Sequence, residues 1–248
     1  MLRIGHKGAD ALVPGNTVAS FERAVEVGVD AIEFDVLWTE DGHPSIAPDR
    51  RSELVVAHDW EAAAAADAKE ERLTLDAALE AFTGPPLDQV VINLDIKLPG
   101  RDDEVFEAVR AHGLLERATI STMEVSTLRR LGDLKRQEGI ERGLGLGWTV
   151  PKVTKDWLGM PKVIRPALAM GLASVRVRTP SRVRRGLSGL AVDSVWAFQG
   201  VVTPRLVETI HDAGKRLNVW TVDDPGRIAA LAALGVDGIC SNDPRLLN

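Results

Sequence analysis

Two apolar stretches of this sequence each carry a pair of ionisable residues separated by one position. Glu33 and Asp35 form the first pair, and Asp95 and Lys97 form the second. Residues two apart in a β-strand point to the same side, so the members of each pair share a face. Carboxylates that face one another repel unless a cation lies between them. The three carboxylates therefore suggest a site for one hard divalent ion, Mg²⁺ or Ca²⁺.

The same spacing also fits a purely structural arrangement. A buried charge is costly unless it is paired or bound to a metal. Lys97 could form an ion pair with Asp95 or with Glu33. Spacing alone favours neither the metal site nor the ion pair.

Two of the five histidines close apolar runs that resemble strands. His6 ends the run 2–6, and His58 follows the run 54–57. Two imidazoles beside a metal suit proton transfer in the cleavage of a phosphate ester. The remaining histidines fall on predicted helices or near a turn, and we expect no catalytic role for them: His43, His112 and His211.

β-branched apolar runs alternate with helical patterns along the whole chain. The expected strands are 2–6, 31–37, 90–97, 118–121, 143–149, 192–198, 216–222 and 237–240. Strict alternation of strand and helix predicts a parallel sheet. Eight such units in 248 residues favour a closed (β/α)₈ barrel, the TIM barrel, over an open sheet. Catalytic residues of such barrels stand at the C-terminal ends of the strands, where the candidate residues fall.

Two stretches interrupt this alternation, and we expect both to belong to one domain spanning 1–248. The first, at about 38–72, combines a hairpin-like excursion with an alanine-rich run that predicts a solvated helix or linker. The second, at about 151–190, places prolines among arginines and predicts an enlarged loop and helix. Its arginines suit a lipid surface or an anionic substrate. A solvated basic helix face is the simpler expectation.

Composition argues against several classes of protein. The net charge of −6 is unfavourable for a nucleic-acid partner. No stretch approaches the roughly 18 uncharged apolar residues of a membrane span, so we expect no stable membrane insertion. Cys240 is the only cysteine, which suits a reducing compartment. Because the first residues also lack the apolar core of a signal peptide, we expect a cytoplasmic protein. Its oligomeric state is not predicted.

The motifs that contain the candidate residues resemble those of the glycerophosphodiester phosphodiesterase family. The family signature runs His-Arg-Gly, Glu-Asn-Thr, Gly-x-Asp, Ile-Glu-x-Asp-Val, Asp-Gly, His-Asp and Glu-x-Lys. The matching segments here are His6-Lys7-Gly8, Gly15-Asn16-Thr17, Gly28-Val29-Asp30, Ile32-Glu33-Phe34-Asp35-Val36, Asp41-Gly42, His58-Asp59 and Asp95-Ile96-Lys97. Residues 219–244 are similar to the closing Trp-Thr-Val and Gly-Val-Asp-Gly-Ile elements of the family. The resemblance covers nearly the whole chain.

This resemblance implies a TIM barrel, one divalent metal ion, and hydrolysis of glycerophosphodiesters to glycerol 3-phosphate and an alcohol. It implies that three carboxylates hold the metal: Glu33, Asp35 and Asp95.

The resemblance also assigns roles to residues outside the metal site. It implies that His6 and His58 act as acid and base, and that Lys7 and Lys97 bind the phosphate. Trp220 would wall the glycerol side of the pocket; barrel packing is the alternative role for this residue.

Three positions depart from the family pattern. Lys7 replaces an arginine, so a guanidinium group that can form two parallel hydrogen bonds with a phosphate is replaced by a single ammonium group. Gly15 replaces a glutamate expected near the metal, which leaves one carboxylate fewer. Asp95 is shorter than the glutamate whose place it takes.

The second histidine depends on how the excursion is aligned. An ungapped match from Gly42 would put Pro48-Asp49 where the family has His-Asp. We prefer His58-Asp59, because the residues before it form the required apolar run and a proline side chain cannot transfer a proton.

Two other functions remain open. One is a lyase-like transfer, as in the related spider-venom phospholipases that form cyclic phosphates, against which the expected cytoplasmic location and the single cysteine weigh. The other is a catalytically weak or dead barrel that binds phosphodiesters or a protein partner. Gly15 keeps this second possibility open, whereas both histidines and all three carboxylates argue against it.

Overall fold

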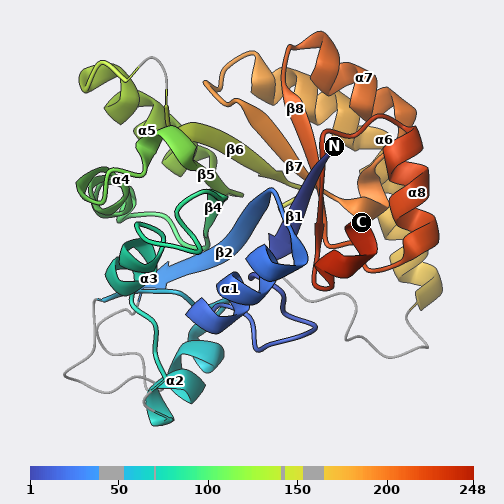
Figure 1. Cartoon of the computed structure of the whole chain (residues 1–248). Coiled ribbons are helices and arrows are strands. Elements are labelled where there is room, and N and C mark those ends of the chain that lie inside the picture. The colour runs from blue at the N-terminus through green and yellow to red at the C-terminus, as the bar shows by residue number, and fades with distance from the viewer. Residues whose placement is uncertain (39–52, 70, 141–142, 153–164) are drawn as a thin grey trace.

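A closed barrel of parallel strands forms the centre of the chain (Figure 1). The computed structural model describes residues 1–38, 53–69, 71–140, 143–152 and 165–248. Around the barrel the strands are β1 (Leu2–His6), β2 (Ala31–Trp38), β4 (Val91–Ile96), β5 (Ala118–Thr122), β6 (Gly145–Val150), β7 (Ser194–Phe198), β8 (Arg216–Trp220) and β9 (Gly238–Ser241). β1 pairs with both β2 and β9, which closes the ring. The predicted TIM barrel is confirmed.

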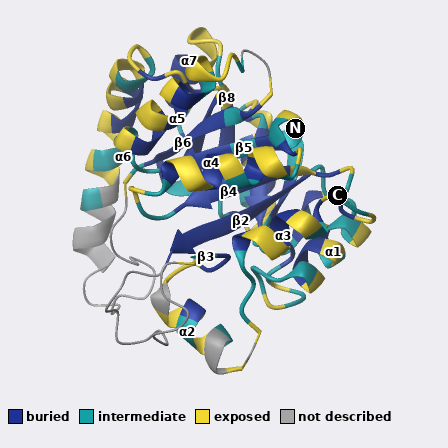
Figure 2. Ribbon diagram, turned by 90° about the vertical axis from the view of Figure 1, so that its left-hand side faces the viewer, coloured by how far each residue is buried: buried dark blue, intermediate teal, exposed yellow. Residues whose placement is uncertain are grey.

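Helices cover the outside of the barrel (Figure 1). The α-helices on this layer are α1 (Val18–Val27), α3 (Leu75–Ala81), α4 (Asp102–Ala111), α5 (Val125–Gln137), α6 (Arg165–Leu187), α7 (Pro204–Asp212) and α8 (Pro225–Ala233). Short 3₁₀ turns are η2 (Leu115–Arg117), η4 (Gln199–Val201) and η5 (Pro244–Leu247). Figure 2 shows buried strands and helices whose outer faces are exposed. None of the described helices is long and apolar enough to cross a membrane.

The main apolar core lies between the strands and these helices. Phe21 on α1, Phe34 on β2 and Phe82 at the end of α3 are fully buried, and their ring centroids lie 5.2–5.6 Å apart. Phe34 faces outward into this core because it alternates with Glu33 and Asp35 along β2. Packing on the outer face thus directs both carboxylates into the barrel.

Part of the expected excursion after β2 is described. β3 (Leu54–Val55) pairs antiparallel with the end of β2, and α2 (Trp60–Ala68) follows it. The alanine-rich run therefore begins as a helix, and Ala63 packs it against Val55. Residues 39–52, which include His43 and the alternative Pro48-Asp49, lie outside the described residues.

The expected loop and helix after β6 contains the long helix α6. Its described arginines are exposed: Arg176, Arg178, Arg182, Arg184 and Arg185. This exposure agrees with the expectation of a solvated basic face.

A second, smaller apolar cluster fills part of the barrel interior. It consists of four buried residues from β1, β2, β7 and β9: Ile4, Ala31, Trp196 and Cys240. Trp196 and Cys240 also line the cavity described below, so this cluster forms part of its inner wall.

Candidate active site

A cavity of about 90 Å³ lies at the C-terminal ends of the barrel strands. Six of the eight residues predicted for the site line it: His6, Glu33, His58, Asp95, Lys97 and Trp220. The other two residues are Asp35 and Lys7. Asp35 is fully buried and forms an ion pair with Lys97, and the Nζ atom of Lys7 lies 4.0 Å from Asp35. The barrel therefore brings all eight residues into one region.

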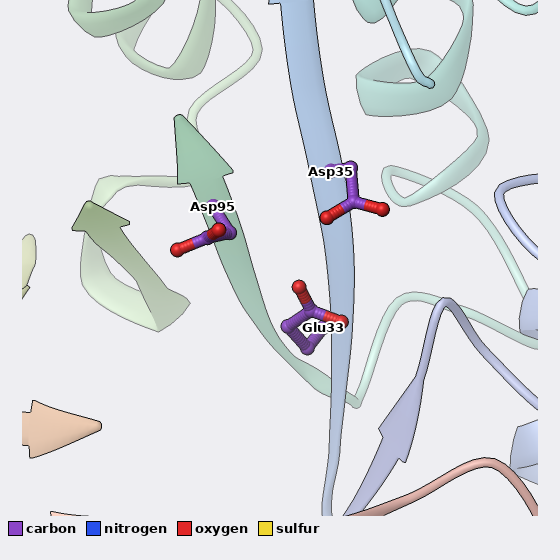
Figure 3. A group of neighbouring side chains, drawn as sticks. All are labelled: Glu33, Asp35 and Asp95. Atoms are coloured by element: carbon purple, nitrogen blue, oxygen red, sulfur yellow. The ribbon is translucent and has the colours of Figure 1, made fainter. Parts of the chain in front are cut away.

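The three carboxylates lie together on neighbouring strands. Asp35 on β2 is directly opposite Asp95 on β4 in the strand register. Glu33, Asp35 and Asp95 each offer an oxygen within 4.8 Å of the others, and all three residues are buried. Figure 3 shows Asp35 and Asp95 at the same level, with Glu33 nearer the start of β2. The two-residue spacing on β2 thus produces the shared face that the sequence predicts.

Lys97 lies between two of these carboxylates. Its Nζ atom is 2.5 Å from Asp35 Oδ1 and 2.6 Å from Asp95 Oδ2. Burial would lower the pKa of Lys97, but Asp35, Asp95 and Glu33 together raise it above its ordinary value. Lys97 is therefore charged. The expected ion pair with Asp95 is present, and it exists beside the carboxylate cluster rather than instead of it.

The charge balance of this cluster fits a divalent cation. Three carboxylates face two ammonium groups, since Lys7 Nζ lies 4.0 Å from Asp35. Burial and the neighbouring Asp35 raise the pKa of Glu33 well above its ordinary value. The ionised form of Glu33 is therefore unfavourable beside the two lysines alone, and a bound cation would stabilise it. An all-oxygen donor set is the kind that Mg²⁺ and Ca²⁺ prefer.

Asn16 holds Asp35 through both of its amide atoms. Asn16 Nδ2 donates to Asp35 Oδ2 at 2.9 Å, and the backbone N–H of Asp35 donates to Asn16 Oδ1 at 3.1 Å. His58 Nδ1 lies 3.3 Å from the same Oδ2 atom. Burial alone would raise the pKa of Asp35, but Lys97 and His58 hold it well below its ordinary value. The sequence alone does not predict this contact, although Asn16 lies within the Gly15-Asn16-Thr17 motif.

The loop around Gly15 explains why no carboxylate occupies that position. The backbone N–H of Gly15 donates to Asp10 Oδ1 at 2.9 Å. A Cβ atom added to Gly15 would lie 2.5 Å from the same oxygen and 2.7 Å from Lys7 Cβ. This loop conformation therefore has no space for a side chain at position 15.

A chain of hydrogen bonds orients His6. Asn242 Nδ2 donates to Asp223 Oδ2 at 2.7 Å, and the backbone N–H of Asn242 donates to Asp223 Oδ1 at 2.8 Å. The Oδ1 atom of Asn242 therefore faces His6 Nδ1, 2.6 Å away, and Nδ1 must carry the proton. The unprotonated Nε2 atom lies 3.8 Å from Glu33. Burial lowers the pKa of His6, so the imidazole is neutral near pH 7.

His58 occupies the more open side of the cavity. Its side chain is 54% exposed, compared with 18% for His6. The two other described histidines make contacts away from the cavity. His112 Nδ1 forms a hydrogen bond with the backbone carbonyl of Ala108 on α4, and His211 Nε2 lies 2.9 Å from Asp237 Oδ2.

Comparison of the sequence with known proteins identifies one family. The profile of the glycerophosphoryl diester phosphodiesterase family matches residues 6–246. A glycerophosphodiester phosphodiesterase of Caldanaerobacter subterraneus subsp. tengcongensis is 28% identical over 99% of this chain and 96% of that protein. A probable glycerophosphodiester phosphodiesterase 2 of Mycobacterium tuberculosis is 27% identical over 99% of this chain and 89% of that protein.

Solved structures share the fold. A putative glycerophosphoryl diester phosphodiesterase from Silicibacter pomeroyi superposes with a TM-score of 0.68 at 20% identity, covering 98% of this chain and 90% of that one. An Oleispira antarctica phosphodiesterase in complex with the product sn-glycerol-3-phosphate superposes with a TM-score of 0.64 at 18% identity, covering 98% and 93%. The match across residues 6–246 shows that this chain belongs to the glycerophosphoryl diester phosphodiesterase family, and is a phosphoric diester hydrolase.

Proposed function

We propose that this protein hydrolyses glycerophosphodiesters to glycerol 3-phosphate and an alcohol, with one divalent metal ion and two histidines. One observation carries the proposal: a buried carboxylate cluster and two histidines converge on a single cavity at the catalytic end of a TIM barrel. The product bound to the Oleispira antarctica relative supports the substrate class.

Glu33, Asp35 and Asp95 would hold the metal, which is Mg²⁺ or Ca²⁺. When bound, the ion supplies positive charge that polarises a phosphoryl oxygen. Lys97 lies next to this cluster and Lys7 lies beside Asp35, and both ammonium groups would attract the phosphate.

His6 has the features of a general base. Its Nδ1–H bond to Asn242 leaves Nε2 free to accept a proton from the attacking water. The lowered pKa of His6 keeps it ready for this step near neutral pH.

His58 has the features of a general acid. It is open to the mouth of the cavity, where the leaving alcohol must depart, and its Nδ1 atom lies 3.3 Å from Asp35 Oδ2. A proton on the departing oxygen is required because an alkoxide is a poor leaving group.

The proposal is tested with a panel of glycerophosphodiesters that carry different alcohols. Each is incubated with purified protein after EDTA treatment, and then after addition of Mg²⁺ or Ca²⁺ alone. We expect release of glycerol 3-phosphate only after one of the ions is added. If no diester is cleaved under any condition, the binding-only barrel is the better account. A cyclic phosphate as the final product would favour the lyase-like reaction.

The cytoplasmic location and the single domain over 1–248 remain predictions from the sequence.

A further inference from the structure

The long helix α6 carries a strongly basic surface on the outside of the barrel (Figure 1). Its sequence contains six arginines and no acidic residue, although the chain as a whole has a net charge of −6. Five of these arginines lie in the described part of the helix, and their side chains are exposed: Arg176, Arg178, Arg182, Arg184 and Arg185. We call these five residues the α6 arginine face.

The opposite side of α6 packs on the barrel. Thr179 and Val183 are buried there. A Cβ atom added to Gly186 would overlap the ring of Trp148 on β6, so the backbone of the helix rests directly on this ring. The apolar side of α6 is therefore held in the core, and the helix cannot turn it toward another surface.

Three of the arginines form a stripe along the exposed side of the helix. Arg178, Arg182 and Arg185 are separated by four and three positions, so they are neighbours on one side of the helix. This stripe points away from the barrel, because the buried residues of α6 occupy the other side.

Arg176 extends the positive charge toward the catalytic end of the barrel. Burial lowers the pKa of Arg227 on α8, and the charge of Arg176 lowers it further, so the two guanidinium groups lie near one another. Arg227 donates a hydrogen bond to the backbone carbonyl of Gln199, which directly follows β7. The α6 arginine face thus reaches the same end of the strands as the cavity.

The α6 arginine face has no acidic partner among the described residues. Exposed arginines on other helices differ in this respect. Three of them each pair with a carboxylate: Arg110 with Glu107, Arg130 with Asp103, and Arg136 with Asp133. Five guanidinium groups without carboxylates produce a positive potential on one side of an otherwise acidic protein, and this potential attracts a polyanion.

An anionic lipid bilayer is the polyanion that suits this surface best. Its phosphate groups can accept paired hydrogen bonds from several guanidinium groups at once. α6 has no aromatic side chain on which a nucleic-acid base could stack, and no Asn or Gln that could read a base edge. It does expose Val177, which at 76% is the most exposed large apolar side chain among the described residues. An apolar side chain between two arginines suits the boundary between headgroups and acyl chains.

We propose that the α6 arginine face docks this protein on the surface of an anionic phospholipid bilayer, with the guanidinium groups at the headgroup phosphates. The contact is electrostatic, because the apolar side of α6 is held in the core. Each arginine near an anionic bilayer strengthens binding by a factor of about five. Salt screens this attraction, and at about 1 M salt the Debye length falls to about 3 Å. Docking should therefore require anionic lipid and disappear at high salt.

Co-sedimentation with lipid vesicles tests the proposal. The vesicles contain either phosphatidylcholine alone or phosphatidylcholine mixed with phosphatidylglycerol. We expect the wild-type protein to sediment only with the vesicles that contain phosphatidylglycerol, and only at low salt. The triple variant Arg178→Gln, Arg182→Gln, Arg185→Gln should bind these vesicles on the order of 10²-fold more weakly.

The matched control removes the same charge from three exposed arginines that are paired. It is the triple variant Arg110→Gln, Arg130→Gln, Arg136→Gln, which we expect to bind like the wild-type protein. If the wild-type protein does not sediment with anionic vesicles, or if both triple variants lose binding equally, the proposal is wrong. Binding to single-stranded RNA or to polyglutamate but not to vesicles would instead assign the surface to a nucleic acid or an acidic protein.

A fluorescent label identifies which surface meets the bilayer. Cys240 is the only cysteine and is buried, so the thiol introduced by Val177→Cys can be labelled selectively. An environment-sensitive dye at this position should shift its emission to shorter wavelength when anionic vesicles are added. The control is Val91→Cys at the start of β4, where the valine is 41% exposed and where we expect no shift.

The two labelled variants keep every arginine, so they test the proposal even if the triple variant does not fold. A shift at position 91 without one at position 177 would show that another surface docks, and would overturn the proposal. Hydrolysis of a water-soluble glycerophosphodiester without vesicles should be the same in the wild-type protein and both triple variants. Loss of docking and loss of the proposed reaction are therefore separate results.

Discussion

The Nδ1 atom of His6 lies 2.6 Å from the Oδ1 atom of Asn242, two residues that are 236 positions apart in the chain. Asp223 fixes the amide of Asn242 from the other side through two hydrogen bonds. The residue that follows the last strand of the barrel thereby sets the tautomer of a histidine on the first strand. His6 is positioned by the closure of the barrel.

Asn242→Ala should reduce turnover more than it reduces stability. The imidazole would lose the acceptor that holds the proton on Nδ1, so Nε2 would no longer be reliably available as a base. We expect kcat to fall by a factor on the order of 10²–10⁴ if base catalysis is lost completely, and by less if the ring reorients only part of the time. Steady-state kinetics and thermal unfolding together check this expectation. Asn248→Ala, which changes a surface residue at the C-terminus, is the control. Equal kinetics in both variants would contradict the positioning role.

The pH dependence of hydrolysis should be bell-shaped. Burial disfavours the imidazolium form of His6, so its pKa lies below about 6.5. A general base acts when unprotonated, so kcat/KM should rise with pH through this lowered pKa. Loss of the proton from the general acid should cause the fall at higher pH. His6→Ala should abolish the rising limb, and persistence of that limb would show that another group is the base.

His58→Ala should lower kcat on glycerophosphodiesters by a factor on the order of 10²–10⁴. A nitrophenyl phosphodiester has a leaving group that needs no proton, so it should restore much of the lost rate in this variant. His6→Ala should show no such rescue, because its defect lies in the attack. His43→Ala should have little effect. If neither histidine variant is rescued, the assignment of the acid is wrong.

Gly15→Ala should destabilise the loop that carries Asn16. The added Cβ atom would overlap Asp10 and Lys7, and overpacking of this kind costs about 1–3 kcal/mol. For a chain of this size, each kcal/mol lowers the melting temperature by roughly 2–4 °C. Gly84→Ala is the matched control, because nothing lies within 4 Å of its added Cβ atom. An unchanged melting temperature for Gly15→Ala would contradict the packing argument.

The sequence predicted the barrel and much of the cavity because both follow from local patterns. Alternating strands and helices predicted the closed sheet, and the two-residue spacing predicted that Glu33 and Asp35 share a face. The partners that orient the site come from distant segments. Asn242 reaches His6 only when β9 pairs with β1. Trp196 reaches the cavity because a glycine stands on the adjacent strand, and the spacing along β7 carries no sign of that contact.

The position of His58 shows a different limit of the sequence patterns. The sequence predicts that the apolar run before His58 resembles a strand that ends at the catalytic side of the barrel. In the structure this run forms β3, a short strand that pairs antiparallel with the end of β2. His58 nevertheless reaches Asp35, because β3 starts from the same end of the barrel. The apolar run pointed to a histidine that lines the cavity, while the pairing direction depended on the fold around it.

Metal-dependent hydrolysis at the carboxylate cluster is most directly tested with Glu33→Gln. The substitution keeps the shape of the side chain and removes one negative charge from the proposed ligand set. We would measure the rate of glycerophosphodiester hydrolysis against the concentration of added Mg²⁺ or Ca²⁺, with Glu107→Gln on the exposed face of α4 as the control. We expect the wild-type protein and the control to lose activity on chelation and to regain it with one of the ions, and Glu33→Gln to stay folded and inactive. Hydrolysis that is equally fast in the wild-type protein after exhaustive chelation would contradict the account.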